Sequence, residues 1–197
     1  MNEKFSAPSR RQFVQTSAAV VGAGMSSQII TSAKAANPIT GRIKVGLIGC
    51  GGRGTGATVQ AMKADSRVEL WALADVFPEQ IEKTQGVVKA EMDPRRVRLN
   101  DSRKFVGLDS YAKILQTDID LVLIATPGGF RPYHIKAAVE AGKHIFCEKP
   151  MAVDPHGIRL VIDAVAEAKR KNLAIRAGFN MRFYPAYREA IKRIHAG

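Results

Sequence analysis

The sequence predicts an α/β fold with a doubly wound parallel sheet and helices on both of its faces. Three observations lead to this prediction. From residue 43 onward, short aliphatic segments alternate with longer helical ones, which favours parallel strands joined by right-handed crossovers. A glycine-rich turn joins the first strand to the first helix. The composition, 46% hydrophobic and 24% charged over 197 residues, excludes disordered, collagen-like and disulfide-scaffold proteins.

The first residues precede the predicted fold and have the pattern of an export signal. The run Ser9-Arg10-Arg11-Gln12-Phe13-Val14 is followed by a mildly apolar stretch to Ile30 and by the small-x-small pattern Ala33-Lys34-Ala35. This pattern is typical of a twin-arginine signal peptide. We therefore expect residues 1–35 to be a cleaved signal, residues 36–41 a linker, and the protein to be periplasmic or otherwise extracytoplasmic.

A membrane anchor and an amphipathic surface helix are the two alternative interpretations of this segment. A membrane anchor is disfavoured because polar residues and glycines interrupt the apolar run well short of the ~20 residues that a span needs. An amphipathic surface helix would not require two adjacent arginines before the run. We expect no membrane anchoring after cleavage.

The first strand of the fold is predicted over residues 43–49, which are mostly aliphatic. It runs into Gly49-Cys50-Gly51-Gly52-Arg53-Gly54 and then into a helix over residues 55–63. The spacing fits G-x-G-x-x-G, in which the first glycine permits a sharp turn, the second a close approach to pyrophosphate and the third close helix–strand packing. Glycine-rich turns also arise for steric reasons alone. The prediction of a phosphate site therefore depends on the strand before the loop and the helix after it.

The second strand, residues 68–74, ends at Asp75, which lies 21 residues after Gly54. That is close to the ~20-residue spacing at which a carboxylate meets the adenosine ribose of a dinucleotide. Asp75 could alternatively cap the helix expected from Pro78. The residues Val76-Phe77-Pro78 provide no cation for a 2′-phosphate, so a Rossmann-type domain that prefers NAD over NADP is predicted.

The remaining elements continue the alternation of strands and helices. A polar stretch between the second helix and the third contains one short apolar segment that fits a strand. The expected helices cover residues 78–91, 109–115, 131–141 and 155–171, and the expected strands cover residues 97–99, 120–125, 143–147 and 173–177.

Ligands of doubly wound sheets bind beyond the carboxyl ends of the strands, and the motifs there resemble one family. Ala125-Thr126-Pro127, the histidine at 134 and the run from Ala141 to Glu148-Lys149-Pro150 are similar to the Gfo/Idh/MocA oxidoreductases. The segment from Gly178 to Pro185 is also similar. The resemblance covers nearly all of residues 42–197, and the Glu-Lys-Pro motif is its most specific part.

This resemblance implies roles for single residues. Lys149, before a proline that favours an extended backbone and a candidate cis bond, is expected to be catalytic by hydrogen-bonding a carbinol oxygen. Glu148 is expected at the nicotinamide or its ribose, and Arg182 at the cofactor or substrate edge. From the residues alone, Lys149 could be a surface charge paired with Glu148, and Arg182 an ordinary ion-pair partner. The full cofactor-binding set is Gly49, Cys50, Gly51, Gly52, Arg53, Gly54, Asp75, Thr126, Pro127, Glu148, Lys149 and Arg182.

The other residues of chemical interest receive structural interpretations. Thr126 and Pro127 could form simply a strand-ending turn, and His134 is at least as well explained by capping or packing as by catalysis. Cys50 and Cys147 are expected to be small packing residues. The four histidines lack partners at zinc spacing, so no metal site is predicted.

The resemblance also predicts the domain organisation. Residues 42–180 would form the dinucleotide-binding domain, and residues 181–197 would begin the connection to a second α/β domain that this sequence lacks. That domain would supply an Asp-x-x-x-His pair and the interface of a homo-oligomer, and no such pair occurs after Lys149. The sequence is thus expected to be a fragment or a truncated chain that binds a dinucleotide but turns over poorly.

Three functions follow as hypotheses. The first is an exported NAD-dependent oxidoreductase of a sugar, polyol or amino sugar. The second is a glycoside hydrolase in which NAD transiently oxidises a ring hydroxyl, and the third a nucleotide-binding fragment without catalysis. The net charge of +12 raises nucleic acid as a partner, but half of the excess lies in the last 31 residues without interleaved stacking aromatics. A solvated or partner-covered face is the favoured interpretation, with no nucleic acid as partner.

Overall fold

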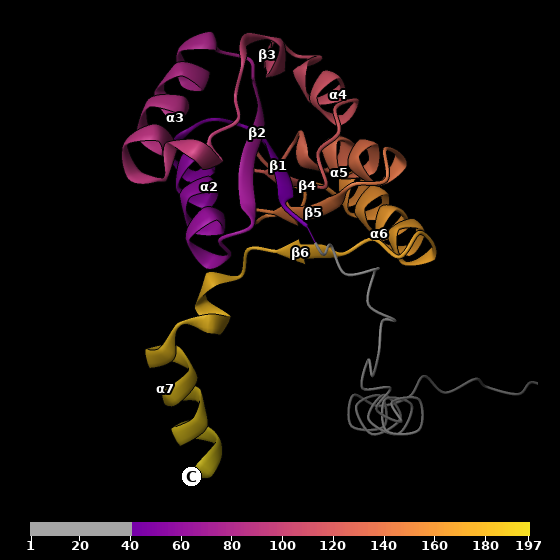
Figure 1. Ribbon diagram of the computed structural model, residues 1–197. Coiled ribbons are helices and arrows are strands. Elements are labelled where there is room, and N and C mark those ends of the chain that lie inside the picture. The colour runs from indigo at the N-terminus through magenta and orange to yellow at the C-terminus, as the bar shows by residue number, and fades with distance from the viewer. Residues whose placement is uncertain (1–40) are drawn as a thin grey trace, which may run out of the picture. The chain divides into compact units, whose positions relative to one another are not determined.

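The computed structural model describes residues 41–197, which contain a six-stranded parallel sheet of strand order β3-β2-β1-β4-β5-β6 (Figure 1). This order is that of dinucleotide-binding domains. The chain adds β2 and β3 on one side of β1, and then β4, β5 and β6 on the other side. The predicted signal peptide and nearly all of the predicted linker lie outside the described residues. The strands are β1 (Ile43–Ile48), β2 (Val68–Asp75), β3 (Lys104–Val106), β4 (Leu121–Ile124), β5 (His144–Cys147) and β6 (Ile175–Ala177).

Helices cover both faces of this sheet, as predicted. One layer consists of α2 and α3 and the other of α4, α5 and α6 (Figure 1). The helices are α2 (Gly52–Ala64), α3 (Pro78–Glu91), α4 (Ser110–Leu115), α5 (Arg131–Glu140), α6 (Pro155–Arg170) and α7 (Pro185–Ala196), with 3₁₀ turns η1 (Pro94–Arg96), η2 (Asp101–Arg103) and η3 (Asn180–Phe183).

The core has two clusters, one on each side of the sheet. Ile124, Ile135 and Ile145 belong to the cluster under α4, α5 and α6. Leu70 and Ile81 belong to the cluster under α2 and α3. Burial on both faces explains why the central strands are aliphatic throughout instead of alternating with polar residues.

The sequence also explains where helices begin and end. Asp154 caps α6 by accepting a hydrogen bond from the Gly157 backbone N–H at 2.6 Å. After the same helix, Asn172 adopts a left-handed conformation with φ of 54°. Helix α7 buries none of its residues within the described part of the chain.

Two expectations about the elements are wrong. Val97–Leu99 is not a strand, because it forms one isolated bridge between Val97 and Leu70; the edge strand is Lys104–Val106. Helix α2 begins at Gly52, three residues before the expected start at Thr55, so the glycine loop itself contributes its first turn.

Trp71 occupies an irregularity in β2. The register with β1 shifts so that Val45 faces Leu70 and Gly46 faces Ala72, which leaves Trp71 without an opposite residue. Its indole N–H donates to Asp118 at 2.5 Å, and the guanidinium of Arg103 lies 3.8 Å from the ring centre. These contacts hold the chain's single tryptophan outside the pocket described below.

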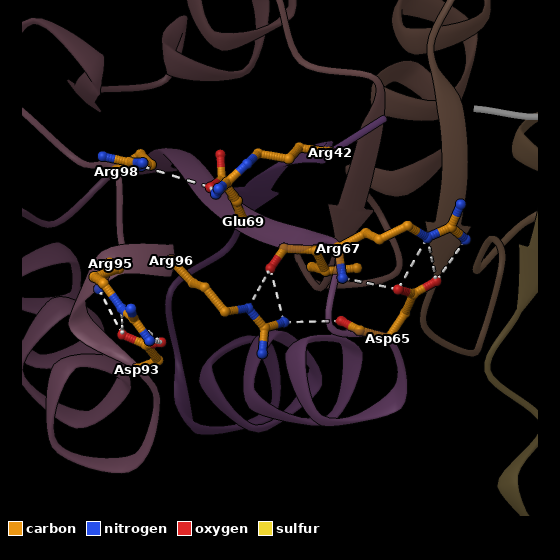
Figure 2. A network of polar contacts seen from close by, with 9 residues as sticks. Arg42, Asp65, Arg67, Glu69, Asp93, Arg95, Arg96 and Arg98 are labelled. Carbon is orange, nitrogen blue, oxygen red and sulfur yellow. Dashed lines mark hydrogen bonds and ion pairs between the residues drawn. The ribbon is translucent and has the colours of Figure 1, made fainter. Parts of the chain in front are cut away.

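At the amino end of β2, a network of arginines stabilises turns far from the carboxyl ends of the strands (Figure 2). Arg96 donates to the carbonyls of Met62, Asp65 and Val68 and so satisfies the last turn of α2. The buried carboxylate of Glu69 pairs with Arg42 and Arg98. The arginines of this network therefore have a structural role, through ion pairs and through hydrogen bonds to backbone carbonyls.

No helix within residues 41–197 is both long and apolar enough to span a membrane.

Candidate functional site

A pocket of about 700 Å³ opens at the carboxyl ends of β1, β2 and β4, where the strand order reverses. Its volume falls in the range of small-molecule sites. Six of the predicted site residues line it: Gly49, Gly51, Gly52, Asp75, Thr126 and Pro127.

The glycine loop forms one wall and packs too closely for side chains at two positions. Gly49 has φ of +93°, and a Cβ there would lie 2.9 Å from the backbone of Ala125 and Thr126. A Cβ at Gly54 would lie 1.9 Å from the carbonyl oxygen of Gly49. Gly51 and Gly52 face open space, where an added Cβ would have no neighbour within 4 Å. Close packing behind the loop and open backbone in front of it are the two features that a phosphate-binding glycine loop requires.

The N-terminus of α2 faces this open space. Gly51 is its N-cap and provides no side-chain hydrogen bond, and the first turn contains no acidic residue. The first N–H groups of a helix lack intrahelical partners and carry the positive end of the helix dipole, so this end suits an anion such as pyrophosphate.

Asp75 lies at the end of β2 and orients the loop. Its carboxylate accepts hydrogen bonds from the backbone N–H groups of Cys50 at 2.6 Å and Phe77 at 3.0 Å. The second bond is a local turn before α3, but Asp75 is not the N-cap of that helix, which is Phe77. Asp75 therefore contacts the start of α3 without capping it, and its shorter hydrogen bond is with the glycine loop.

An aromatic cluster also lines the pocket. His134 stacks on Tyr111 with ring centres 4.4 Å apart and on Phe130 with ring centres 6.3 Å apart. Thr126 Oγ1 lies 3.1 Å from His134 Nδ1. Burial lowers the pKa of His134 to about 4, so the imidazole is neutral at pH 7.

This histidine predicts a pH dependence of folding stability. Because the pKa of His134 is depressed to about 4 in the folded state, the unfolded chain binds the proton more tightly, and stability falls as the pH drops below 6.5. We expect a loss of about 2 kcal/mol between pH 7 and pH 5 from this group, and His134→Phe should remove it while keeping the ring stacking. Urea unfolding of both proteins at the two pH values measures the difference. An equal loss in both proteins would refute the assignment.

Arg53 and Glu148 join the glycine loop to the turn after β5. Arg53 Nε donates to Glu148 Oε1 at 2.7 Å. Glu148 is only 3% exposed, whereas the Arg53 side chain is 39% exposed. A Cβ at Gly178 would lie 3.0 Å from both carboxylate oxygens, so the glycine after β6 leaves room for this buried acid.

Lys149 follows Glu148 and is exposed, and the Lys149–Pro150 bond is cis, as the sequence suggested. Lys149 is not paired with Glu148, because the partner of that carboxylate is Arg53. The next carbonyl, that of Pro150, accepts a hydrogen bond from the buried Arg131 at 2.5 Å.

The other six predicted site residues lie outside the pocket lining, and Arg53, Glu148 and Lys149 are three of them. Cys50 and Gly54 shape the glycine loop from behind. Arg182 lies on η3, against the groove along α7, with its guanidinium 5.5 Å from the Phe179 ring centre. Burial raises the pKa of the thiols of Cys50 and of Cys147, the latter to about 12, so neither is a thiolate at neutral pH.

Sequence reasoning missed several residues of the pocket. They come from α3, the turn after β3 and α4, and they belong to no recognisable motif. Lys83 is among them and lies five residues after Pro78, the end of the segment that provides no cation for a 2′-phosphate. These lining residues are Gln80, Lys83, Leu108, Ser110 and Tyr111. Within residues 41–197, no group of three metal-ligating side chains comes together.

Comparison with known proteins places this pocket in a family context. Residues 43–177 match the Gfo/Idh/MocA family model, described as an oxidoreductase family with an NAD-binding Rossmann fold. The chain is 30% identical over 158 residues to inositol 2-dehydrogenase 4 of Saccharopolyspora erythraea, covering 79% of this chain and 41% of that protein. It is 30% identical over 139 residues to a glycosyl hydrolase family 109 protein of Streptomyces coelicolor, covering 70% of this chain and 28% of that one.

A solved structure extends the comparison to a protein with bound ligands. The scyllo-inositol dehydrogenase of Lactobacillus casei, with bound cofactor NAD(H) and scyllo-inositol, superposes with a TM-score of 0.61 at 28% identity, covering 79% of this chain and 42% of that one. The chain thus spans about two fifths of the length of these inositol dehydrogenases.

Proposed function

The chain belongs to the Gfo/Idh/MocA oxidoreductase family, and on this premise we propose that it is the NAD-binding domain of an enzyme that oxidises a sugar or polyol. The observation that carries the proposal is the pocket itself. Open glycine backbone, a helix N-terminus without a side-chain cap and a strand-end carboxylate line one cavity. Relatives named as inositol dehydrogenases support the class of substrate.

The residues present fit a nicotinamide dinucleotide. The pyrophosphate would lie against Gly51 and Gly52 at the start of α2, where N–H groups are free to donate. Asp75 would accept from the adenosine ribose hydroxyls while it holds the Cys50 N–H. Thr126 and Pro127, on the next strand end, would lie under the nicotinamide half.

When bound, NAD supplies the hydride acceptor for the carbinol carbon of the substrate. The protein's own residues would contribute electrostatic stabilisation. The ammonium group of Lys149 would donate a hydrogen bond to the carbinol oxygen and stabilise the negative charge that builds on it. The hydroxyl proton would pass to the Asp-x-x-x-His pair that the family resemblance implies, and not to His134. Its pKa of about 4 and its stacking on Tyr111 make it a wall residue and a weak base at neutral pH.

Calorimetric titration of NAD into the 197-residue chain tests the binding proposal. Saturable heat is expected, together with energy transfer from Trp71 to bound NADH, since Trp71 lies four residues, roughly 13 Å along the strand, before Asp75. Absence of both signals would refute the proposal. For activity, the whole protein purified from its native host should form NADH with a sugar or polyol.

Asp75→Ala should weaken NAD binding. It removes an acceptor for the ribose and releases the Cys50 N–H, and a hydrogen bond to a charged group is worth about 1.5–3 kcal/mol, or roughly 10- to 150-fold in affinity. The affinity for NADP should rise relative to the affinity for NAD, because the carboxylate no longer repels a 2′-phosphate and Lys83 lines the same pocket. The matched control is Asp93→Ala, which removes a similar turn carboxylate on η1. Unchanged NAD affinity in Asp75→Ala would contradict the assigned contact.

A second candidate function is an NAD-dependent glycoside hydrolase, which the similarity to a glycosyl hydrolase family 109 protein favours. In that reaction, oxidation of a ring hydroxyl acidifies a neighbouring C–H, the aglycone is eliminated and the cofactor is regenerated. Release of a chromogenic aglycone without net NADH formation would support it. Net NADH formation with a free sugar would support the dehydrogenase. A third candidate, a binding module without catalysis, predicts NAD binding and neither product.

Export is part of the same proposal. The twin-arginine pattern of residues 1–35 supports transport of a folded chain that already holds its cofactor. Sequencing the N-terminus of the mature protein from cells tests this. A mature protein that still begins at Met1 would refute export with cleavage.

A further inference from the structure

Lys149 has no side-chain partner in the described part of the chain, yet an arginine binds the residue on each side of it, at the Glu148 side chain and at the Pro150 backbone carbonyl. Before it, Glu148 receives a 2.7 Å hydrogen bond from Arg53. After it, the Pro150 carbonyl receives a 2.5 Å hydrogen bond from Arg131. The position of the lysine therefore depends on two contacts made by its neighbours.

Both arginines come from segments that build the pocket. Arg53 lies in the glycine loop after β1. Arg131 begins α5, directly after Phe130, which lines the pocket. The turns after β4 and β5 also touch: a Cβ at Gly128 would lie 3.2 Å from the Pro150 ring and 2.9 Å from Val153. The two arginines thus connect the lysine-bearing turn to the two loops of the pocket.

Packing alone does not account for Arg131. The residue is only 6% exposed, pairs with no carboxylate in residues 41–197, and has a buried Nε without a hydrogen-bond partner. A buried guanidinium without a counter-ion is unfavourable, and an apolar side chain of similar volume would generally be more stable there. What the arginine provides at this place is its donor to the Pro150 carbonyl.

We propose that Arg131 is a positioning residue: it binds the backbone carbonyl after Lys149 while Arg53 binds the Glu148 side chain before it, so that the ammonium group is held beside the nicotinamide of the bound cofactor. This inference rests on the proposed function, in which Lys149 contacts the reacting oxygen. The placement matters because displacement of a catalytic group by ~1 Å can reduce a rate about 100-fold.

Chemical labelling of lysines tests the proposal in the full 197-residue chain. Each protein is acetylated with an N-hydroxysuccinimide ester alone, with NADH or with ADP, and the rate at each lysine is measured by mass spectrometry. In the wild type, NADH should slow acetylation of Lys149, whereas ADP, which lacks the nicotinamide half, should not. Lys83 should be protected by both ligands because it lines the pocket from α3, the helix that follows Asp75. Lys136, exposed and paired with Glu140 on α5, should be protected by neither.

The variants separate positioning from binding. Arg131→Met should bind ADP as the wild type does and lose the protection of Lys149 by NADH, while Lys83 stays protected. Arg131→Lys, which keeps a charged donor, should retain part of the protection. Arg131→Gln replaces Arg131→Met if the latter does not fold, and the same loss is expected.

Three results would overturn the inference, each in a distinguishable way. Full protection of Lys149 in the folded Arg131→Met or Arg131→Gln variant would show that the arginine does not position it. Binding of NADH to the wild type without protection of Lys149 would refute the proposed contact of the lysine, and the inference with it. Failure of the wild type to bind NADH or ADP would refute the proposed function.

Discussion

Gly54→Ala is expected to abolish measurable NAD binding and to destabilise the domain. The added Cβ would lie 1.9 Å from the carbonyl oxygen of Gly49 and 3.2 Å from the Ala125 side chain. Because the first atom belongs to backbone, no side-chain rotation relieves the overlap, and α2 must move away from β1. Overpacking of this kind typically costs about 1–3 kcal/mol, and the shifted helix no longer presents its N-terminus to the pocket.

Gly56→Ala is the matched control for that variant. It lies in the same helix two residues later, and its Cβ would meet only the Arg53 side chain at an ordinary 3.7 Å. Alanine is about 1 kcal/mol more favourable than glycine inside a helix, so this variant should be as stable as the wild type or more so. Thermal unfolding and NAD calorimetry on the two variants make the comparison. Wild-type NAD affinity in Gly54→Ala would contradict the close packing assigned to the loop.

Arg53→Met is expected to destabilise the fold by roughly 2–3 kcal/mol. It leaves the Glu148 carboxylate, only 3% exposed, without its charged partner, and breaking a buried ion pair from one side is strongly unfavourable. This loss of unfolding free energy is smaller than the loss on breaking a fully buried ion pair, because the Arg53 side chain is 39% exposed and water reaches the site.

A double-mutant cycle identifies the cause of that destabilisation. Arg53→Met with Glu148→Gln removes both charges, so the double variant should be more stable than Arg53→Met alone. Urea unfolding of the wild type, the two single variants and the double variant gives the coupling energy. If the two substitutions destabilise additively, the ion pair does not contribute as described.

The glycine loop and Asp75 could be predicted from sequence because their physics is local. A turn with positive φ, a close helix approach and a carboxylate at a strand end leave a fixed spacing of residue types. The edge strand could not be predicted in the same way. Lys104-Phe105-Val106 is three residues long, whereas Val97–Leu99 has an equally apolar pattern and forms only one bridge.

Arg131 and the aromatic wall illustrate what sequence could not supply. An arginine at the start of a helix has the pattern of an exposed charge, and only the fold brings it beneath the Pro150 carbonyl. Tyr111 and His134 lie 23 positions apart, and their stacking depends on the packing of α4 beside α5. Such contacts come from tertiary packing, which no short motif encodes.

The sheet ends on both sides in strands of only three residues, β3 and β6. A short border offers few free main-chain groups on which a foreign strand could add. The longest strands, β1 and β2, are not at the border: β1 lies between β2 and β4, and the outer side of β2 pairs with β3 at Leu73–Asp75 and with Val97 at Leu70. In the described domain, β1 is therefore shielded and β2 is partly shielded from amyloid-like addition of a foreign strand.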